Sequence, residues 1–101
     1  MDFVNYTPHT IVLNNGISYP SQGIVRVSSS FSDFNDDNIC SVIYGDVQGL
    51  PDPKPNTKYI VSNIVLSVLK SKRNDLAASA TGHPDCVRLD GYIVSVPGFI
   101  C

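Results

Sequence analysis

The segment "KSKRNDL" at residues 70–76 places an arginine and an aspartate two positions apart. A guanidinium group carries its N–H donors in a planar fork that matches two oxygens of a phosphate or carboxylate. Arg73 and Asp75 could therefore reach into a groove and hold an anionic ligand, or they could pair with each other. A run of charge at this point is also typical of a solvated helix end.

A second candidate is the segment "YTPHT" at residues 6–10. Pro8 fixes its own φ and favours an extended Thr7, so a rigid corner presents His9. An imidazole offers a donor and an acceptor near neutral pH and suits an anionic or nucleobase ligand. The alternative is that Thr7 and His9 satisfy backbone groups in a buried corner.

A third candidate is Tyr44 in "VIYGDVQGLP". Its ring is a flat stacking surface that carries a hydroxyl, and Gly45 and Gly49 would let a ligand approach the backbone closely. A β-bulge with a core tyrosine would explain the same pattern.

A covalent catalyst is poorly supported by the sequence. His83 and Cys86 lie close together in "ATGHPDCVR", but a nucleophile and a base need a third, orienting group that is not evident here. The three cysteines and two histidines lack the spacing of a zinc site, and no phosphate-binding glycine loop occurs. We therefore expect no catalytic residues, no metal and no cofactor, although the residues leave the enzyme question open.

Composition and charge argue against some classes of partner. The 101 residues carry seven Lys and Arg against nine acidic side chains, a net charge of −2, which provides no basic field for nucleic acid. The longest apolar stretch is interrupted by Ser62, Asn63 and Ser67 and is too short to cross a membrane. The first residues lack the basic start and apolar core of a signal peptide. We expect one cytoplasmic domain spanning residues 1–101, with no membrane and no nucleic-acid partner.

The elements that would position these residues are mostly strands. Asn15-Gly16 and Asp90-Gly91 each lie between β-favouring runs, which predicts two hairpins. Further strands are predicted within 21–29 and 38–50. The acidic segment 31–38 between them reads as a solvated loop with Phe31 and Phe34 as anchors.

The stretch 58–76 reads as a strand followed by a helix. Tyr59 to Val61 favour a strand after the proline-rich surface connection 51–57, and Ser62 or Asn63 can cap a helix over 63–71. Ile64, Val65, Val68 and Leu69 share one face of that helix, and Lys70 and Lys72 suit its C-terminal end. One long buried strand is the alternative.

The predicted fold class is therefore α+β: a mostly antiparallel twisted sheet of about six strands, open or closed as a small barrel, with one short helix.

The order of motifs resembles a family of small phage and prophage proteins. The motifs are "VNYTPHTIVL", "YGDVQGLPDPKPNTKYIVS", "RNDL" and the closing "VRLDGYIVSVPGF". Members typically open with Asn-x-Thr-Pro-His and continue with Tyr-Gly, Gly-Leu-Pro, Gly-Thr-x-Tyr-Ile-Val-Ser and Arg-x-Asp-Leu. Here Asn56 stands where the family usually has glycine, and no proline closely follows Leu76.

The resemblance implies a small accessory protein that meets host defences by sequestering a nucleotide-derived immune signal in the host cytoplasm, as a homo-oligomer in some cases. The side chains that would suit stacking, hydroxyl donation and phosphate binding are Thr7, His9, Tyr44, Tyr59, Ser62, Arg73 and Asp75. Two alternatives stay open: a small hydrolase or phosphodiesterase with His9 or His83 as the base, and an inhibitor that docks on another protein through a sheet edge.

Overall fold

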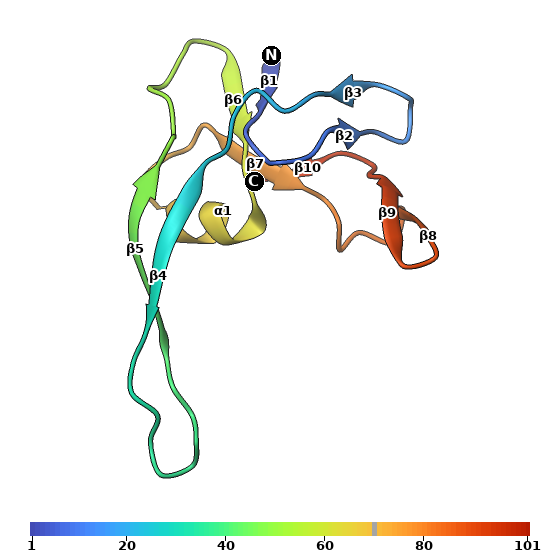
Figure 1. Ribbon diagram of the computed structural model, residues 1–101. Helices are drawn as coiled ribbons and strands as arrows, with labels where there is room; N and C mark the ends of the chain where they lie inside the picture. The colour runs from blue at the N-terminus through green and yellow to red at the C-terminus, as the bar shows by residue number, and fades with distance from the viewer. Residues whose placement is uncertain (70) are drawn as a thin grey trace.

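The computed structural model describes residues 1–69 and 71–101 and consists mostly of strands with one short helix (Figure 1). The elements are, in chain order, β1 (Asp2–Asn5), β2 (Ile11–Val12), β3 (Ser18–Tyr19), β4 (Arg26–Phe31), β5 (Val42–Gln48), β6 (Thr57–Ile60), α1 (Asn63–Leu69), β7 (Leu76–Ser79), β8 (Val87–Leu89), β9 (Tyr92–Ser95) and β10 (Phe99–Ile100). This agrees with a small α+β fold.

The central sheet has four strands in the order β1-β6-β7-β10. β1 and β6 are parallel, as are β6 and β7, while β10 runs antiparallel to β7. The predicted sheet of about six mostly antiparallel strands is not confirmed. The other described strands form three separate pairs, β2-β3, β4-β5 and β8-β9, and no sheet closes into a barrel within the described residues.

Alternation along β6 divides the core between the two faces of the central sheet. Tyr59 and Val61 pack with Val65 and Leu69 of α1, whereas Ile60 packs with Ile11 of β2. Successive side chains of a strand point to opposite faces, so one short strand supplies both clusters. The helix therefore covers one face and the β2-β3 pair the other.

The strand-then-helix prediction for 58–76 is confirmed. The Ser62 Oγ accepts a hydrogen bond from the Val65 N–H at 3.3 Å, as expected of an N-cap residue. The structure describes α1 from Asn63 to Leu69, Ser71 lies in a turn and not in the predicted helix, and β7 begins at Leu76. Parallel β6 and β7 thus flank α1 in a β-α-β unit, which brings the 71–75 turn beside the end of the sheet. The prediction for Lys70 lies outside the described residues.

Both hairpin predictions are confirmed, with different turns. Asp90 and Gly91 have φ of 52° and 82° and form a two-residue turn between the paired Leu89 and Tyr92. In the first hairpin the Leu13 N–H donates to the Ile17 carbonyl, and only Gly16 has a positive φ. That loop therefore holds three residues rather than two.

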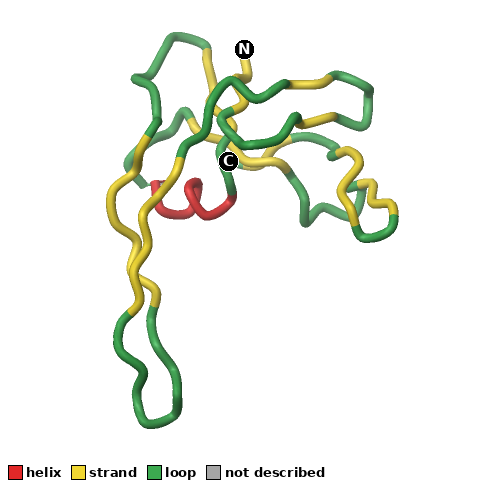
Figure 2. Tube along the Cα trace, viewed as in Figure 1, coloured by secondary structure: helices red, strands yellow, loops and turns green. Residues whose placement is uncertain are grey.

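The β4-β5 pair projects from the rest of the molecule as a long ribbon (Figure 2). A β-bulge interrupts its register between Val27 and Ser29. Val27 and Val47 at its base pack on the core, but Phe31 and Phe34 are exposed. The prediction that these two rings anchor the loop is wrong, because the ribbon carries them away from the core.

The proline-rich segment 51–57 runs along the surface, as predicted, and Asn56 near its end has a positive φ. Asn56 has a φ of 54°, in the left-handed region that glycine adopts freely and asparagine tolerates. No helix among the described residues is long and apolar enough to cross a membrane.

Candidate functional site

Arg73 and Asp75 pair with each other. Arg73 Nε donates to Asp75 Oδ1 at 2.7 Å and Nη2 donates to Asp75 Oδ2 at 2.6 Å, so the fork is already filled by a carboxylate. Nη2 also donates to the Pro51 carbonyl at 3.1 Å. The pair therefore ties the proline-rich segment to the turn before β7.

Electrostatics reinforces this pair. The hydrogen bond from Arg73 lowers the pKa of the Asp75 carboxyl, and the same bond raises the pKa of the guanidinium. Both side chains are largely buried. Of the two alternatives open at the level of sequence, the geometry favours mutual pairing over a free anion-binding fork.

The Thr7–His9 corner is organised by Asn5, a residue that is only 1% exposed. Asn5 Nδ2 donates to the carbonyls of His9 and Tyr19 at 2.7 and 2.8 Å. Asn5 Oδ1 accepts from the Thr7 N–H at 2.9 Å and from the Thr7 hydroxyl at 2.6 Å. Thr7 and the His9 backbone thus serve the corner itself, while the His9 side chain is exposed.

The remaining predicted residues lie in three different places. Tyr59 is buried under Tyr6 in an edge-to-face contact, with ring centres 5.5 Å apart, and its hydroxyl donates to the Asp52 carbonyl. Ser62 caps α1. Tyr44 lies on the projecting ribbon and is partly exposed, so it is not a core tyrosine. The structure does not gather the seven predicted residues into one site.

Among these residues, Arg73 and Asp75 line one pocket of about 390 Å³, Ser62 lines another of about 310 Å³, and His9 lines a larger groove. The groove has a volume of about 480 Å³ and runs between the segment 9–12, the end of β7 and β9. Its walls are mainly apolar, with Ile11, Val12, Ile93, Val94 and Val96. The polar or aromatic groups that line it are His9, Thr10, Ser79, Thr81, Tyr92 and Ser95.

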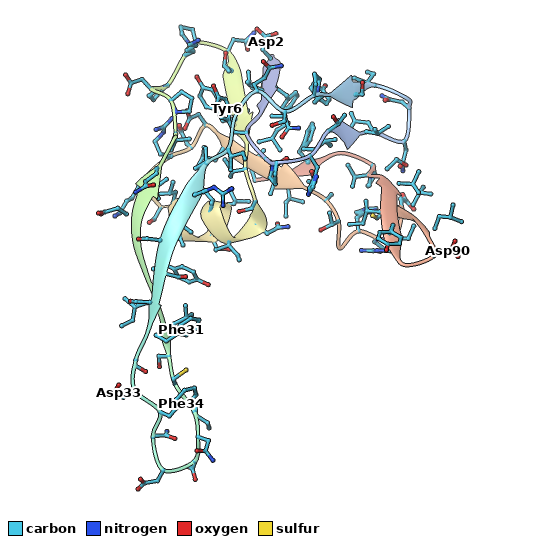
Figure 3. All side chains as sticks on the ribbon, viewed as in Figure 1. Asp2, Tyr6, Phe31, Asp33, Phe34 and Asp90 are labelled. Atoms are coloured by element: carbon cyan, nitrogen blue, oxygen red, sulfur yellow. The ribbon has the colours of Figure 1, made fainter. Side chains whose placement is uncertain are left out.

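Arg88 lies beside this groove, although it does not line it. It pairs across the hairpin with Ile93, which lines the groove, and its Nη2 donates to the carbonyl of Thr81 at 2.6 Å. A guanidinium has five N–H donors, so this single contact fixes the group without using its whole fork. The turn at Asp90, which joins β8 to β9, lies at the outer end of the hairpin (Figure 3).

The His83–Cys86 pair does not form a nucleophile and base in this structure. His83 Nδ1 accepts the backbone N–H of Asp85 at 3.0 Å, and Cys86 N–H donates to the His83 carbonyl. Both contacts stabilise the turn before β8. Within residues 1–69 and 71–101 no three His, Cys, Asp or Glu side chains come together as metal ligands.

Sequence reasoning missed three residues of this region. Asn5 stands two positions before Thr7, the spacing of an Asx-turn, and that signal could have identified it. Arg88 and Tyr92 flank the predicted Asp90-Gly91 turn. Nothing in their spacing indicates that β9 and His9, which are distant in sequence, line the same groove.

No family model matches the chain, and no curated protein or solved structure is significantly similar to it.

Proposed function

We propose that this protein binds a small nucleotide-derived ligand in the groove between β2 and β9 and sequesters it without catalysis. The observation that carries the proposal is the convergence of His9, Tyr92 and several hydroxyl groups on one groove, with Arg88 bonded to the lining residue Thr81. These residues come from three segments that are distant in sequence.

The groove has the size and composition of a ligand site. Small-molecule pockets measure roughly 300–1,000 Å³ and combine apolar walls with a few polar groups. The groove volume of about 480 Å³ lies within that range. Its apolar walls would exclude water from a bound ring, and hydroxyl groups such as that of Thr10 would fix its orientation.

The side chains match the chemistry of a nucleotide. Tyr92 is 78% exposed and offers a ring face on which a base can stack. His9 can donate or accept a hydrogen bond at a base edge. Arg88 supplies N–H donors of the kind that bind phosphate oxygens in pairs. Arg73 is no longer part of the proposed site, because Asp75 occupies its fork.

The biological context of the proposal comes from the resemblance to small phage proteins. A protein of this kind would act in the host cytoplasm by lowering the free concentration of an immune signal, such as a cyclic nucleotide or an ADP-ribose derivative. Sequestration requires only tight binding, so a groove without a catalytic group is sufficient.

The test incubates the protein with cyclic oligonucleotides and cyclic ADP-ribose isomers and measures free ligand by equilibrium dialysis. We expect the protein to deplete one ligand class and to release it chemically intact after denaturation, as read by mass spectrometry. A cleaved product that depends on His9 or His83 would instead establish the hydrolase alternative.

Two valines of one hairpin provide a matched control. Val94 lines the groove and Val87 does not, although both are about half exposed. Val94→Trp should fill the groove and abolish ligand depletion, while Val87→Trp should bind like the wild type. The proposal fails if no ligand of the panel is depleted at about 100 µM protein, a concentration well above the micromolar or lower Kd of specific binding. It also fails if both variants bind the ligand equally.

A further inference from the structure

We propose that the projecting ribbon, residues 26–48, docks on the β8-β9 hairpin of a second copy of this chain. The ribbon and this hairpin are where the molecule leaves its large apolar side chains uncovered. Of sixteen exposed large hydrophobic residues in the described chain, eleven lie on these two elements, which makes them the two candidate surfaces. They are Phe31, Phe34, Ile39, Val42, Ile43 and Tyr44 on the ribbon and Val87, Leu89, Tyr92, Ile93 and Val94 on the hairpin.

The register of the ribbon collects its larger side chains on one face. Phe31 lies opposite Val42, and Tyr44 lies opposite Ser29, two positions further along both strands. Residues that are directly opposite, or two apart, share a face of the ladder. Phe31, Val42 and Tyr44 therefore form one apolar face, while Ile43 and Ser30 point to the other side.

A two-stranded ribbon of this kind is marginally stable by itself in water. β4 and β5 pair only with each other among the described strands, and the Phe31 side chain is largely exposed. A surface that packs on this face would stabilise the ribbon as well as the assembly.

The area that the chain exposes is large enough to supply a dimer interface. The solvent-accessible surface is 6834 Å². A compact monomer of the same mass is expected to expose roughly 5,600 Å². The excess of roughly 1,200 Å² exceeds the roughly 800 Å² that each partner buries in a standard interface. The radius of gyration also indicates a chain that is more extended than a compact monomer. It is 15.5 Å, against about 13 Å for a compact chain of this length.

Charge argues against contact between two ribbons. The ribbon, residues 26–48, carries four aspartates, Asp33, Asp36, Asp37 and Asp46, against one cation, Arg26, at its base. The rest of the chain carries six cationic side chains against five carboxylates. Two ribbons would repel each other, whereas the ribbon and the body of a second copy attract.

The β8-β9 hairpin is the apolar part of that body. Leu89 and Tyr92 are directly opposite each other and are 66% and 78% exposed, so they form a flat apolar pair. Figure 3 shows Phe31 and Asp33 on the ribbon, well apart from Asp90 at the hairpin turn, so a ribbon would meet the hairpin of a second copy and not its own.

Light scattering at about 10–200 µM protein, a range that covers micromolar self-association, tests the assembly. We expect a mass of at least twice the 11.0 kDa monomer. Phe31→Ser and Leu89→Ser should each give a monomer with an unchanged circular dichroism spectrum. Ile43→Ser is the matched control, because Ile43 is exposed on the opposite face of the ribbon, and it should keep the wild-type mass. A monomeric wild type, or equal masses for Phe31→Ser and Ile43→Ser, would overturn the proposal.

A photocrosslink identifies the surface that is covered. A benzoylphenylalanine at position 31 should join two chains on irradiation, and the adduct should map to residues 86–95 of the other copy. Mixing ¹⁴N- and ¹⁵N-labelled protein separates adducts between chains from adducts within one chain. Adducts confined to residues 26–48, or none between chains, would exclude docking on the hairpin. Leu89 does not line the ligand groove, so Leu89→Ser separates loss of assembly from loss of binding.

Discussion

Arg73 holds Asp75 through two parallel hydrogen bonds, of 2.7 and 2.6 Å, and holds the Pro51 carbonyl through a third of 3.1 Å. Asp75 directly precedes β7, and Tyr59 N–H of β6 donates to its carbonyl. The pair thus connects the end of the helical crossover with the proline-rich segment that leads into β6. It fixes the point where the parallel strands β6 and β7 come together.

The first prediction concerns this latch. Arg73→Ala should lower the free energy of unfolding by about 1–3 kcal/mol, since it leaves a partly buried carboxylate without its partner. Arg73→Lys should recover only part of that loss, because an ammonium group cannot make two parallel bonds. Urea unfolding measures both. If Arg73→Ala is as stable as the wild type but no longer binds ligand, Arg73 belongs to the binding site after all.

The second prediction concerns pH. Arg73 lowers the pKa of Asp75 in the folded protein, so the ionised carboxylate stabilises the fold above its unfolded pKa of about 4. This contribution is lost as the pH falls through the lowered value. The stability advantage of the wild type over Asp75→Asn should therefore shrink between about pH 5 and pH 2.

Denaturant titrations at each pH check this difference. Asp33→Asn, which removes a carboxylate from the exposed loop of the ribbon, is the matched control. An Asp75→Asn profile parallel to that of the wild type would contradict the assigned role.

The part of the fold that sequence could predict is the part decided by neighbours in the chain. The Asp90-Gly91 turn follows from residues that tolerate positive φ, and the β6-to-α1 transition follows from a capping serine before a helical apolar face. The pairing of β1 with β6 depends on which distant strand covers Phe3 and Val4, and local pattern carries no such information. The sequence therefore predicts a mostly antiparallel sheet, whereas the three neighbouring strands β1, β6 and β7 run parallel.

The candidate site also combines contacts that neighbouring residues decide with contacts that only the tertiary fold decides. The pairing of Arg73 with Asp75 is one of the two interpretations that the sequence supports, because the residues lie only two positions apart. The groove joins His9 to Tyr92, and only the tertiary fold brings these segments together. The sequence predicts Phe31 and Phe34 to be anchors of the loop, but the ribbon leaves both of them exposed.

The third prediction concerns Asn5. Asn5→Ala should destabilise the protein by roughly 2–5 kcal/mol, because the His9 and Tyr19 carbonyls and the Thr7 N–H lose a buried partner. Thermal unfolding measures the loss. Asn14→Ala is the control: Asn14 also bonds through both ends of its amide, but it is exposed, and its removal should cost less than about 1 kcal/mol.

The fourth prediction compares two glycines with similar backbone angles. Gly16 and Gly49 have φ of 92° and 86°, so alanine is strained at both. A Cβ at Gly16 would meet nothing within 4 Å, whereas one at Gly49 would meet the Ile24 carbonyl oxygen at 2.5 Å. Gly16→Ala should cost about 1–2 kcal/mol. Gly49→Ala should cost clearly more, because the chain beside the ribbon base must move. Equal losses in urea unfolding would contradict the close approach.

The last prediction concerns Arg88 and the ligand. If Arg88 binds a ligand phosphate beside the groove, Arg88→Gln should weaken binding about 10- to 100-fold, as expected when a charge-assisted hydrogen bond worth about 1.5–3 kcal/mol is lost. Arg88→Lys should bind with intermediate affinity, because it keeps the charge but not the paired donors. Arg26→Gln removes the same charge from an exposed position at the start of β4 and should leave affinity within about twofold. Calorimetric titration with the ligand depleted in the panel experiment measures all three. If Arg26→Gln and Arg88→Gln weaken binding equally, the ligand senses only the overall charge of the protein, and the phosphate site must lie elsewhere.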